Sequence, residues 1–219
     1  MIDVKSEIIK KVSEEVKARL SNQESGHDWW HVLRVWNNAK LIAKNEEVDL
    51  FTVELGALLH DIADWKFHDG DDSAGPKAAR GILEANMVSP DVIEQVCQIV
   101  SMVGYKGAGV TTDMATKEGE VVQDADRLDA LGAIGIARTF LYSGHKNRLM
   151  YDPAQPPVMH ESYEAYKKNT SPAINHFYEK LLLLKDRMNT KTGKKLAEGR
   201  HAFMEEYLAQ FMKEWEGKE

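Results

Sequence analysis

Apolar residues recur every three or four positions along most of the chain, which is the spacing of an amphipathic helix. The pattern predicts helices over residues 4–20, 29–44, 50–63, 73–87 and 90–103. Residues 50–63 are almost entirely apolar up to His60, so we expect a central helix that is buried on most sides. No segment of the sequence shows a convincing set of strands. The sequence therefore predicts an all-α fold.

Two segments interrupt the helical pattern. Residues 104–119 contain four glycines and few apolar residues, and residues 143–160 contain Gly144 and three prolines. Irregular stretches of this length in a helical domain are often lids or binding loops. Helical patterning resumes at about residue 160 and continues to 217, with Gly193 as the expected break between two helices. We expect one domain over residues 1–219, a compact bundle with a C-terminal helical extension.

Composition narrows the function classes. The 219 residues carry a formal net charge of −7, which argues against binding a nucleic-acid polymer, because that depends on clustered Lys and Arg. No run reaches the roughly 18 apolar residues of a membrane span, and the N-terminus lacks the apolar core of a signal peptide. The single cysteine, Cys97, allows no disulfide within the chain. We therefore expect a cytoplasmic protein that does not bind membranes.

Histidine and aspartate occur side by side at the end of the apolar segment 50–63. His60 and Asp61 follow two leucines directly. Burying an imidazole beside a carboxylate is costly unless both are paired or bound to a metal. A buried ion pair or a helix-terminal hydrogen bond explains the pair as well as a metal does, so the pair alone decides nothing.

Three aspartates crowd the segment 120–131, which is otherwise apolar enough to face the core. Asp126 and Asp129 are three residues apart and share a helical face, whereas Asp124 points elsewhere. Like charges packed together repel each other and favour a nearby cation. Arg127 supplies one cation, and a metal ion could supply another.

The start of the helix expected over residues 29–44 carries another histidine. Gly26 breaks the chain and Asp28 is a good N-cap, which places His31 in the first turn. Most of the neighbouring aromatic area is expected to pack in the core, and one exposed ring could stack on a nucleobase. The aromatic residues concerned are Trp29, Trp30 and Trp36.

His31, the pair His60-Asp61 and then Asp126 resemble, in this order, the HD-domain metal-dependent phosphohydrolase superfamily. The resemblance implies a compact HD-type helical bundle. It also implies one metal site with His31, His60, Asp61 and Asp126 as ligands. It covers about residues 26–145, the expected catalytic core, while the helices over about 160–217 match less distinctively.

The segment Gly26-His27-Asp28-Trp29-Trp30-His31 is similar to a bacterial subfamily of small HD hydrolases, some of which cleave nucleoside triphosphates. This similarity implies a small phosphorylated metabolite as substrate, with a nucleotide as the expected case. The activity would be that of a nucleoside triphosphate pyrophosphohydrolase or a nucleotidase. A homodimer is left open.

Two imidazoles and two carboxylates suit Mn²⁺, Fe²⁺, Co²⁺, Ni²⁺ or Zn²⁺, and we favour Mn²⁺. We rank Mg²⁺ lower because it prefers oxygen ligands only. Four protein ligands on an octahedral ion leave one position for water and one for a phosphate oxygen. Such an ion lowers the pKa of the water and polarises the phosphorus centre, so we expect hydrolysis by a metal-activated water.

Further candidates surround the ligands. Asp64 returns to the helical face of Asp61 and could orient or deprotonate the water, a role that the resemblance also implies, although it could be a solvated charge. Arg127 is either a counter-ion of the aspartates or a phosphate clamp, and Arg34 has the same two interpretations. The candidate catalytic residues are Asp64, Asp61 and Arg127. The candidate substrate-binding residues, each with a surface or capping alternative, are His27, Arg34 and Lys106.

Two other functions remain open. The HD architecture also supports di-iron oxygenases, but these need two further histidine ligands between the His-Asp pair and the last aspartate. Only His68 lies there, which favours a site for one metal ion. A non-catalytic, metal-stabilised ligand-sensing module is the second alternative.

Overall fold

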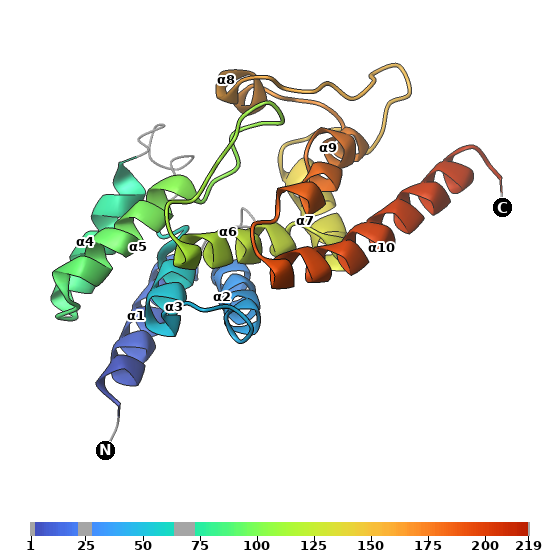
Figure 1. Ribbon diagram of the computed structural model, residues 1–219. Coiled ribbons are helices and arrows are strands. Elements are labelled where there is room, and N and C mark those ends of the chain that lie inside the picture. Colours follow the sequence, from blue (N-terminus) through green and yellow to red (C-terminus); the bar gives the residue numbers. More distant parts are fainter. Residues whose placement is uncertain (1–2, 22–27, 64–72, 219) are drawn as a thin grey trace. The chain divides into compact units, whose positions relative to one another are not determined.

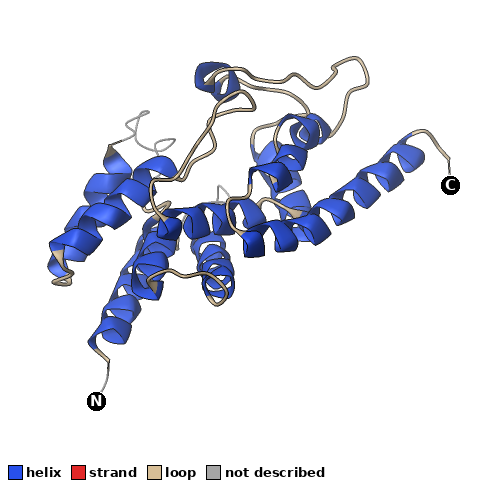
Figure 2. Ribbon diagram, viewed as in Figure 1, coloured by secondary structure: helices blue, strands red, loops and turns tan. Residues whose placement is uncertain are grey.

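Helices make up the regular structure of the computed structural model, which describes residues 3–21, 28–63 and 73–218 (Figures 1 and 2). No strand occurs within these residues. The all-α prediction is therefore confirmed. Among the same residues, no helix combines the length and the apolar character that crossing a membrane requires.

The chain divides into two compact units. The first comprises Met1–Tyr105 and Thr112–Asp126, and the second comprises Lys106–Thr111 and Arg127–Glu219. The first unit contains α1 (Val4–Leu20), α2 (Trp29–Ala43), α3 (Leu50–Leu59), α4 (Ala74–Ala85), α5 (Pro90–Met102) and most of α6 (Lys117–Asp129).

Helix α3 is the central element of the first unit. It packs against α1, α2 and α5, and its residues from Thr52 to Leu59 are buried, apart from the partly buried Glu54. Each fully buried Leu or Val side chain stabilises the fold by about 1.5–3 kcal/mol relative to exposure. The expectation of a central buried helix is confirmed, but the helix ends at Leu59, with His60 as its C-cap.

Gly56 allows the helices of the first unit to approach each other closely. A Cβ atom at this position would lie 3.2 Å from Val122 Cγ2 on α6 and 3.3 Å from Ile99 Cδ1 on α5. These distances are shorter than ordinary van der Waals contacts between carbon atoms. Because His60 caps the end of α3 and Asp126 lies on α6, the small residue helps to bring these candidate ligands together.

The second unit contains the last residues of α6 and two groups of packed helices. Helix α10 packs against α7 and η3, while α9 packs against α7 and η2. Leu181 and Leu184 are buried within this unit. The elements are α7 (Gly132–His145), α8 (Tyr163–Lys167), α9 (Ala173–Glu179), η2 (Leu181–Leu183), η3 (Lys185–Arg187) and α10 (Lys191–Trp215).

Gly193 does not separate two helices, so that prediction is wrong. It lies in the first turn of α10, where its backbone N–H donates to the Thr190 side chain at 2.9 Å. Thr190 is the N-cap of the helix. The break in the helical pattern therefore precedes Lys191.

Two parts of the predicted irregular segments meet within the second unit. Gly109 N donates to His160 O at 3.2 Å, and a Cβ on Gly109 would lie 3.0 Å from Glu161 Cα. Arg187 holds the same loop: its guanidinium donates to the carbonyl oxygens of Gly107, at 3.0 Å, and of Ala108. Residues 106–111 therefore have a fixed conformation without regular secondary structure.

Candidate metal centre

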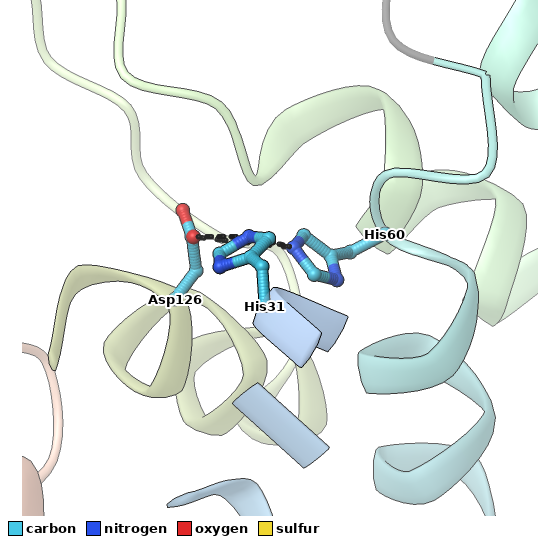
Figure 3. Close-up of side chains that lie close together, drawn as sticks. All are labelled: His31, His60 and Asp126. Atoms are coloured by element: carbon cyan, nitrogen blue, oxygen red, sulfur yellow. Dashed lines mark hydrogen bonds and ion pairs between the residues drawn. The ribbon is translucent and has the colours of Figure 1, made fainter. Parts of the chain in front are cut away.

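His31, His60 and Asp126 form one cluster in the first unit (Figure 3). One ligand atom of each lies within 4.8 Å of the others. The two histidine Nε2 atoms are 3.1 Å apart, and Asp126 Oδ1 lies 3.5 Å from His31 Nε2. Asp61 Oδ2 lies 3.2 Å from the same nitrogen. Two imidazoles and two carboxylates therefore converge on one place.

His31 is placed by the start of α2. The Asp28 side chain accepts a hydrogen bond from the His31 backbone N–H at 2.9 Å, so Asp28 is the N-cap, as expected. Asn38, farther along the same helix, donates to Ala125 O at 3.4 Å. Because Ala125 precedes Asp126, this contact ties the helix of one candidate ligand to the helix of another.

His60 is placed by the end of α3. Its Nδ1 lies 2.8 Å from the Ala57 carbonyl oxygen. A carbonyl oxygen only accepts, so Nδ1 carries the proton and the Nε2 lone pair faces His31 and the carboxylates. A hydrogen bond from the ring nitrogen that does not face the metal commonly fixes the tautomer of a metal-binding histidine. His60 therefore presents the atom that a metal would need.

The centre is open on its carboxylate side. The side chains of His31 and His60 are 0% and 1% exposed, whereas those of Asp61 and Asp126 are 17% and 29% exposed. The imidazoles form the buried base of the centre. A water molecule or a substrate oxygen can approach past the carboxylates.

The spacing of the donor atoms fits one divalent ion. Ligands bound at about 2.1 Å lie about 3.0 Å apart when adjacent and about 4.2 Å apart when opposite. The measured separations between an Nε2 atom and another donor run from 3.1 to 3.9 Å. Mixed nitrogen and oxygen donors suit first-row transition metals. The four residues can therefore hold a divalent metal ion.

The other two aspartates of the 120–131 segment are buried. Asp124 is fully buried, and Asp129 Oδ2 lies 2.9 Å from Arg138 Nη1. Sequence reasoning missed Arg138 as the partner of Asp129, because the two residues meet only after the chain turns between α6 and α7. Of the three aspartates, Asp126 is the one that joins the cluster.

Arg127 is buried, and its guanidinium donates to the Arg187 carbonyl oxygen within the second unit. Arg34 lies on α2, three residues after His31, and is partly buried. Lys106 is partly buried in the loop of the second unit that Arg187 holds. The candidates that lie outside the described residues are His27 and Asp64.

A model of the HD domain matches residues 29–131 of the chain. YpgQ of Bacillus subtilis is 37% identical over 203 residues, which cover 92% of this chain and 91% of YpgQ. The chain belongs to the HD-domain family. The expected resemblance is thereby confirmed, since the matched residues include all four candidate ligands.

Solved structures support the same assignment. A protein of Lactobacillus plantarum shares 37% identity with a TM-score of 0.85, and the match covers 100% of both chains. An HD-superfamily hydrolase of Bacillus thuringiensis shares 44% identity over 98% of this chain and 100% of its own, with a TM-score of 0.76. The expected hydrolase class is thereby confirmed.

YpgQ itself has been solved in complex with ADP. That structure is 34% identical to this chain, covers 97% of both chains, and has a TM-score of 0.77.

Proposed function

We propose that this HD-domain protein hydrolyses a phosphoanhydride or phosphoester bond of a nucleotide. In this proposal, one divalent transition metal ion is bound by four residues, and Mn²⁺ is the preferred ion. The ligands are His31, His60, Asp61 and Asp126. The observation that carries it is the convergence of two imidazole nitrogens and two carboxylate oxygens. His31 Nε2 lies 3.1 Å from His60 Nε2, 3.2 Å from Asp61 Oδ2 and 3.5 Å from Asp126 Oδ1. When bound there, such an ion supplies an activated water and polarises a phosphate.

The protein side chains have separate roles in this proposal. The buried His31 and His60 would bind the ion through their imidazole nitrogens. The more exposed Asp61 and Asp126 would bind it through their carboxylates and would border the place where the phosphate approaches. Asp64 takes the proton of the attacking water. Arg127 acts as a positioning residue, because its guanidinium donates to a backbone carbonyl oxygen.

A nucleotide substrate has two supports. The first is that YpgQ, similar over nearly the whole chain, has been solved in complex with ADP. The second is Trp30, which precedes His31 and is 60% exposed, whereas Trp29 is 9% exposed. An exposed tryptophan offers a face for stacking on a base. Trp30 and Arg34 are four residues apart on one face of α2, which pairs an aromatic ring with a guanidinium.

The remaining proposed substrate contacts are His27 and Lys106. Both are basic side chains that can donate to phosphate oxygens. Lys106 belongs to a loop whose backbone Arg187 holds in place, which lowers the conformational entropy lost when a substrate binds.

The test is an activity screen of the purified chain. Nucleoside tri-, di- and monophosphates and simple phosphate esters are incubated separately with Mn²⁺, Mg²⁺, Co²⁺ and Ni²⁺. We expect release of phosphate or diphosphate from a nucleotide, fastest with Mn²⁺. A chain that binds one metal ion and yet cleaves nothing on the panel contradicts the proposal. Two iron ions per chain with oxygen consumption would also contradict it and favour an oxygenase.

A further inference from the structure

A pocket lies in the second unit and shares no residue with the metal centre. It encloses about 350 Å³ and is lined by residues 146–149 together with Gln155, Thr170 and Pro172. A volume of this size is at the lower end of the range for small-molecule sites. It suits a phosphate group or a small phosphorylated molecule rather than a macromolecule.

Two cationic side chains line this pocket and no carboxylate does: Lys146 and Arg148. Within the described part of the chain, neither forms an ion pair with an acidic residue. The carboxylate of Asp152 is near in sequence, but it accepts hydrogen bonds from Gln155 Nε2 at 2.6 Å and from Ala154 N at 2.9 Å. The pocket therefore carries a positive charge that its own lining does not neutralise.

The chain turns sharply so that both cations reach the same pocket. Asn147 has a φ of 53°, a left-handed conformation that asparagine tolerates better than most residues. Arg148 N donates to Ser143 O at 2.9 Å, which closes the turn after α7. Lys146 Nζ and Arg148 Cζ each lie 5.7 Å from the centre of the Tyr142 ring. The turn thus brings two positive charges beside one aromatic ring.

The guanidinium of Arg148 is held in place from the opposite wall. Its Nη2 donates to the Asn169 carbonyl oxygen at 2.5 Å. The Asn169 and Ser171 side chains both donate to Glu179 Oε2 at 2.7 Å. Glu179 is 1% exposed, so a buried carboxylate fixes the two residues that flank Thr170.

The Gln155 side of the pocket is fixed in the same manner. The buried Asn175 donates through Nδ2 to the Gln155 carbonyl oxygen at 2.8 Å. The pocket walls are therefore set by buried polar groups before any ligand arrives. Such preorganisation raises affinity, because fewer groups are ordered on binding.

The local electrostatics agree with a positive pocket. Burial, together with repulsion from Lys180 and Arg148, lowers the pKa of His176 to about 3. The positive charge of Arg148, which repels a protonated imidazole at His176, also attracts an anion in the pocket.

We propose that this pocket binds a phosphate-bearing small molecule, with Lys146 and Arg148 as the anion-binding pair. Arg148 presents the planar fork that binds two phosphate oxygens at once, and Lys146 adds a mobile point charge. Thr170 also lines the pocket, and its hydroxyl can donate to a third oxygen. The ligand class is inorganic phosphate or diphosphate, or the phosphate end of a metabolite. This site is independent of the proposed hydrolysis, since it involves none of the metal-centre residues.

The test is isothermal titration calorimetry of the full chain with diphosphate and, separately, with ADP. EDTA is present, so that binding through the metal centre does not contribute. We expect binding that weakens as salt is added, and at least a tenfold loss of affinity in Lys146→Gln. The double variant Lys146→Gln/Arg148→Gln should lose binding. Lys194→Gln/Lys195→Gln removes the same charge from exposed positions of α10 and should bind as the unmodified chain does.

The calorimetry results distinguish between the possible ligand classes of the pocket. Binding of diphosphate alone assigns the pocket to inorganic anions, and binding of both probes assigns it to phosphorylated metabolites as well. Lys146→Gln tests the proposal even if loss of Arg148 impairs folding. The Lys146 side chain is exposed and, within the described residues, makes no hydrogen bond; the bonds of the α7 C-cap come from its backbone N–H. Equal affinity of the unmodified chain and Lys146→Gln, or no binding by the unmodified chain, overturns the proposal. Neither result bears on the activity screen, which reports on the metal centre.

Discussion

Asp28 Oδ1 accepts a hydrogen bond from the backbone N–H of His31 at 2.9 Å, which joins the N-cap of α2 to a candidate metal ligand. Loss of an N-cap costs about 0.5–2 kcal/mol of stability. We expect Asp28→Ala to lower the free energy of unfolding by about this amount and to weaken Mn²⁺ binding, because the first turn that carries His31 frays.

Metal titrations followed by thermal unfolding measure both effects. Asp28→Ser keeps a capping oxygen and should restore most of the metal affinity. If Asp28→Ser binds Mn²⁺ as weakly as Asp28→Ala does, the Asp28 carboxylate acts through its charge rather than as a helix cap.

The accessible carboxylate of Asp61 gives the most direct test of the centre. Replacement by Asn keeps the size and removes the charge, so we expect Asp61→Asn to reduce turnover by at least 100-fold and to lower the metal content per chain. Elemental analysis and the nucleotide assay measure the two effects. Asp113→Asn removes one charge from an exposed position and serves as the control. Unchanged turnover in Asp61→Asn would show that the proposed ligand set is wrong.

Trp30 should determine the recognition of the base rather than the chemistry. Stacking of a base on an aromatic ring is worth about 1–3 kcal/mol. We expect Trp30→Ala to raise KM for a nucleotide by about 5- to 150-fold and to leave kcat within a factor of three. Trp30→Phe should recover much of the loss.

Steady-state kinetics with a nucleotide and with inorganic triphosphate, which has no base, separate the two steps. The KM for triphosphate should not change. Leu41→Ala removes another exposed apolar side chain from α2 and is the matched control. Equal effects of Trp30→Ala on both substrates would exclude stacking.

His176 should make the stability of the chain depend on pH. Its pKa is about 3 in the folded state and about 6.5 in an unfolded chain. The folded state therefore keeps a neutral imidazole, while the unfolded state takes up a proton as the pH falls below 6.5. The contribution of this group is complete above pH 6.5 and decreases by about 1.4 kcal/mol per pH unit toward pH 3.

Urea unfolding between pH 4 and pH 7.5 measures this slope. We expect His176→Gln to have a shallower decline of stability with acidification than the unmodified chain. His145→Gln removes an exposed imidazole of the same unit and is the comparison. Identical slopes for His176→Gln and the unmodified chain would disprove the assignment.

Arg187 should be important for stability although it lies in a short 3₁₀ helix. Its guanidinium donates to the carbonyl oxygens of Gly107, Ala108 and Val110. Hydrogen bonds to charged groups contribute about 1.5–3 kcal/mol each and are not additive. We expect Arg187→Lys to lower the free energy of unfolding by about 2–4 kcal/mol, because a lysine ammonium lacks the planar, multiply donating geometry of a guanidinium. Urea unfolding checks this value, with Asp186→Asn as the neighbouring control.

The order of the metal ligands could be predicted from the sequence because each lies in a recognisable helical context. His31 follows an N-cap, and His60 and Asp61 follow an apolar helix. These signals are local, so a single sequence carries them. The convergence of the side chains could not be derived from spacing alone, and the resemblance to the HD family was needed for it.

Other features depend on contacts between distant residues and gave no local signal. The pairing of Asp129 with Arg138 requires the turn between two helices. Gly193 was misread because glycine costs about 1 kcal/mol in a helix interior. In the first turn its N–H is satisfied by Thr190, and it is buried, so a small residue fits there. Thr190 was the available signal for this helix start.

The contact between Arg187 and the 106–111 loop also sets an order of events during synthesis. The guanidinium comes from a residue 80 positions after Gly107. At a translation rate of about 5–20 residues per second, Arg187 is synthesised roughly 4–16 s after Gly107. During that interval Lys106 lies on an unsecured stretch of nascent chain. The Arg187 contacts of this loop are therefore made only after most of the chain has been synthesised.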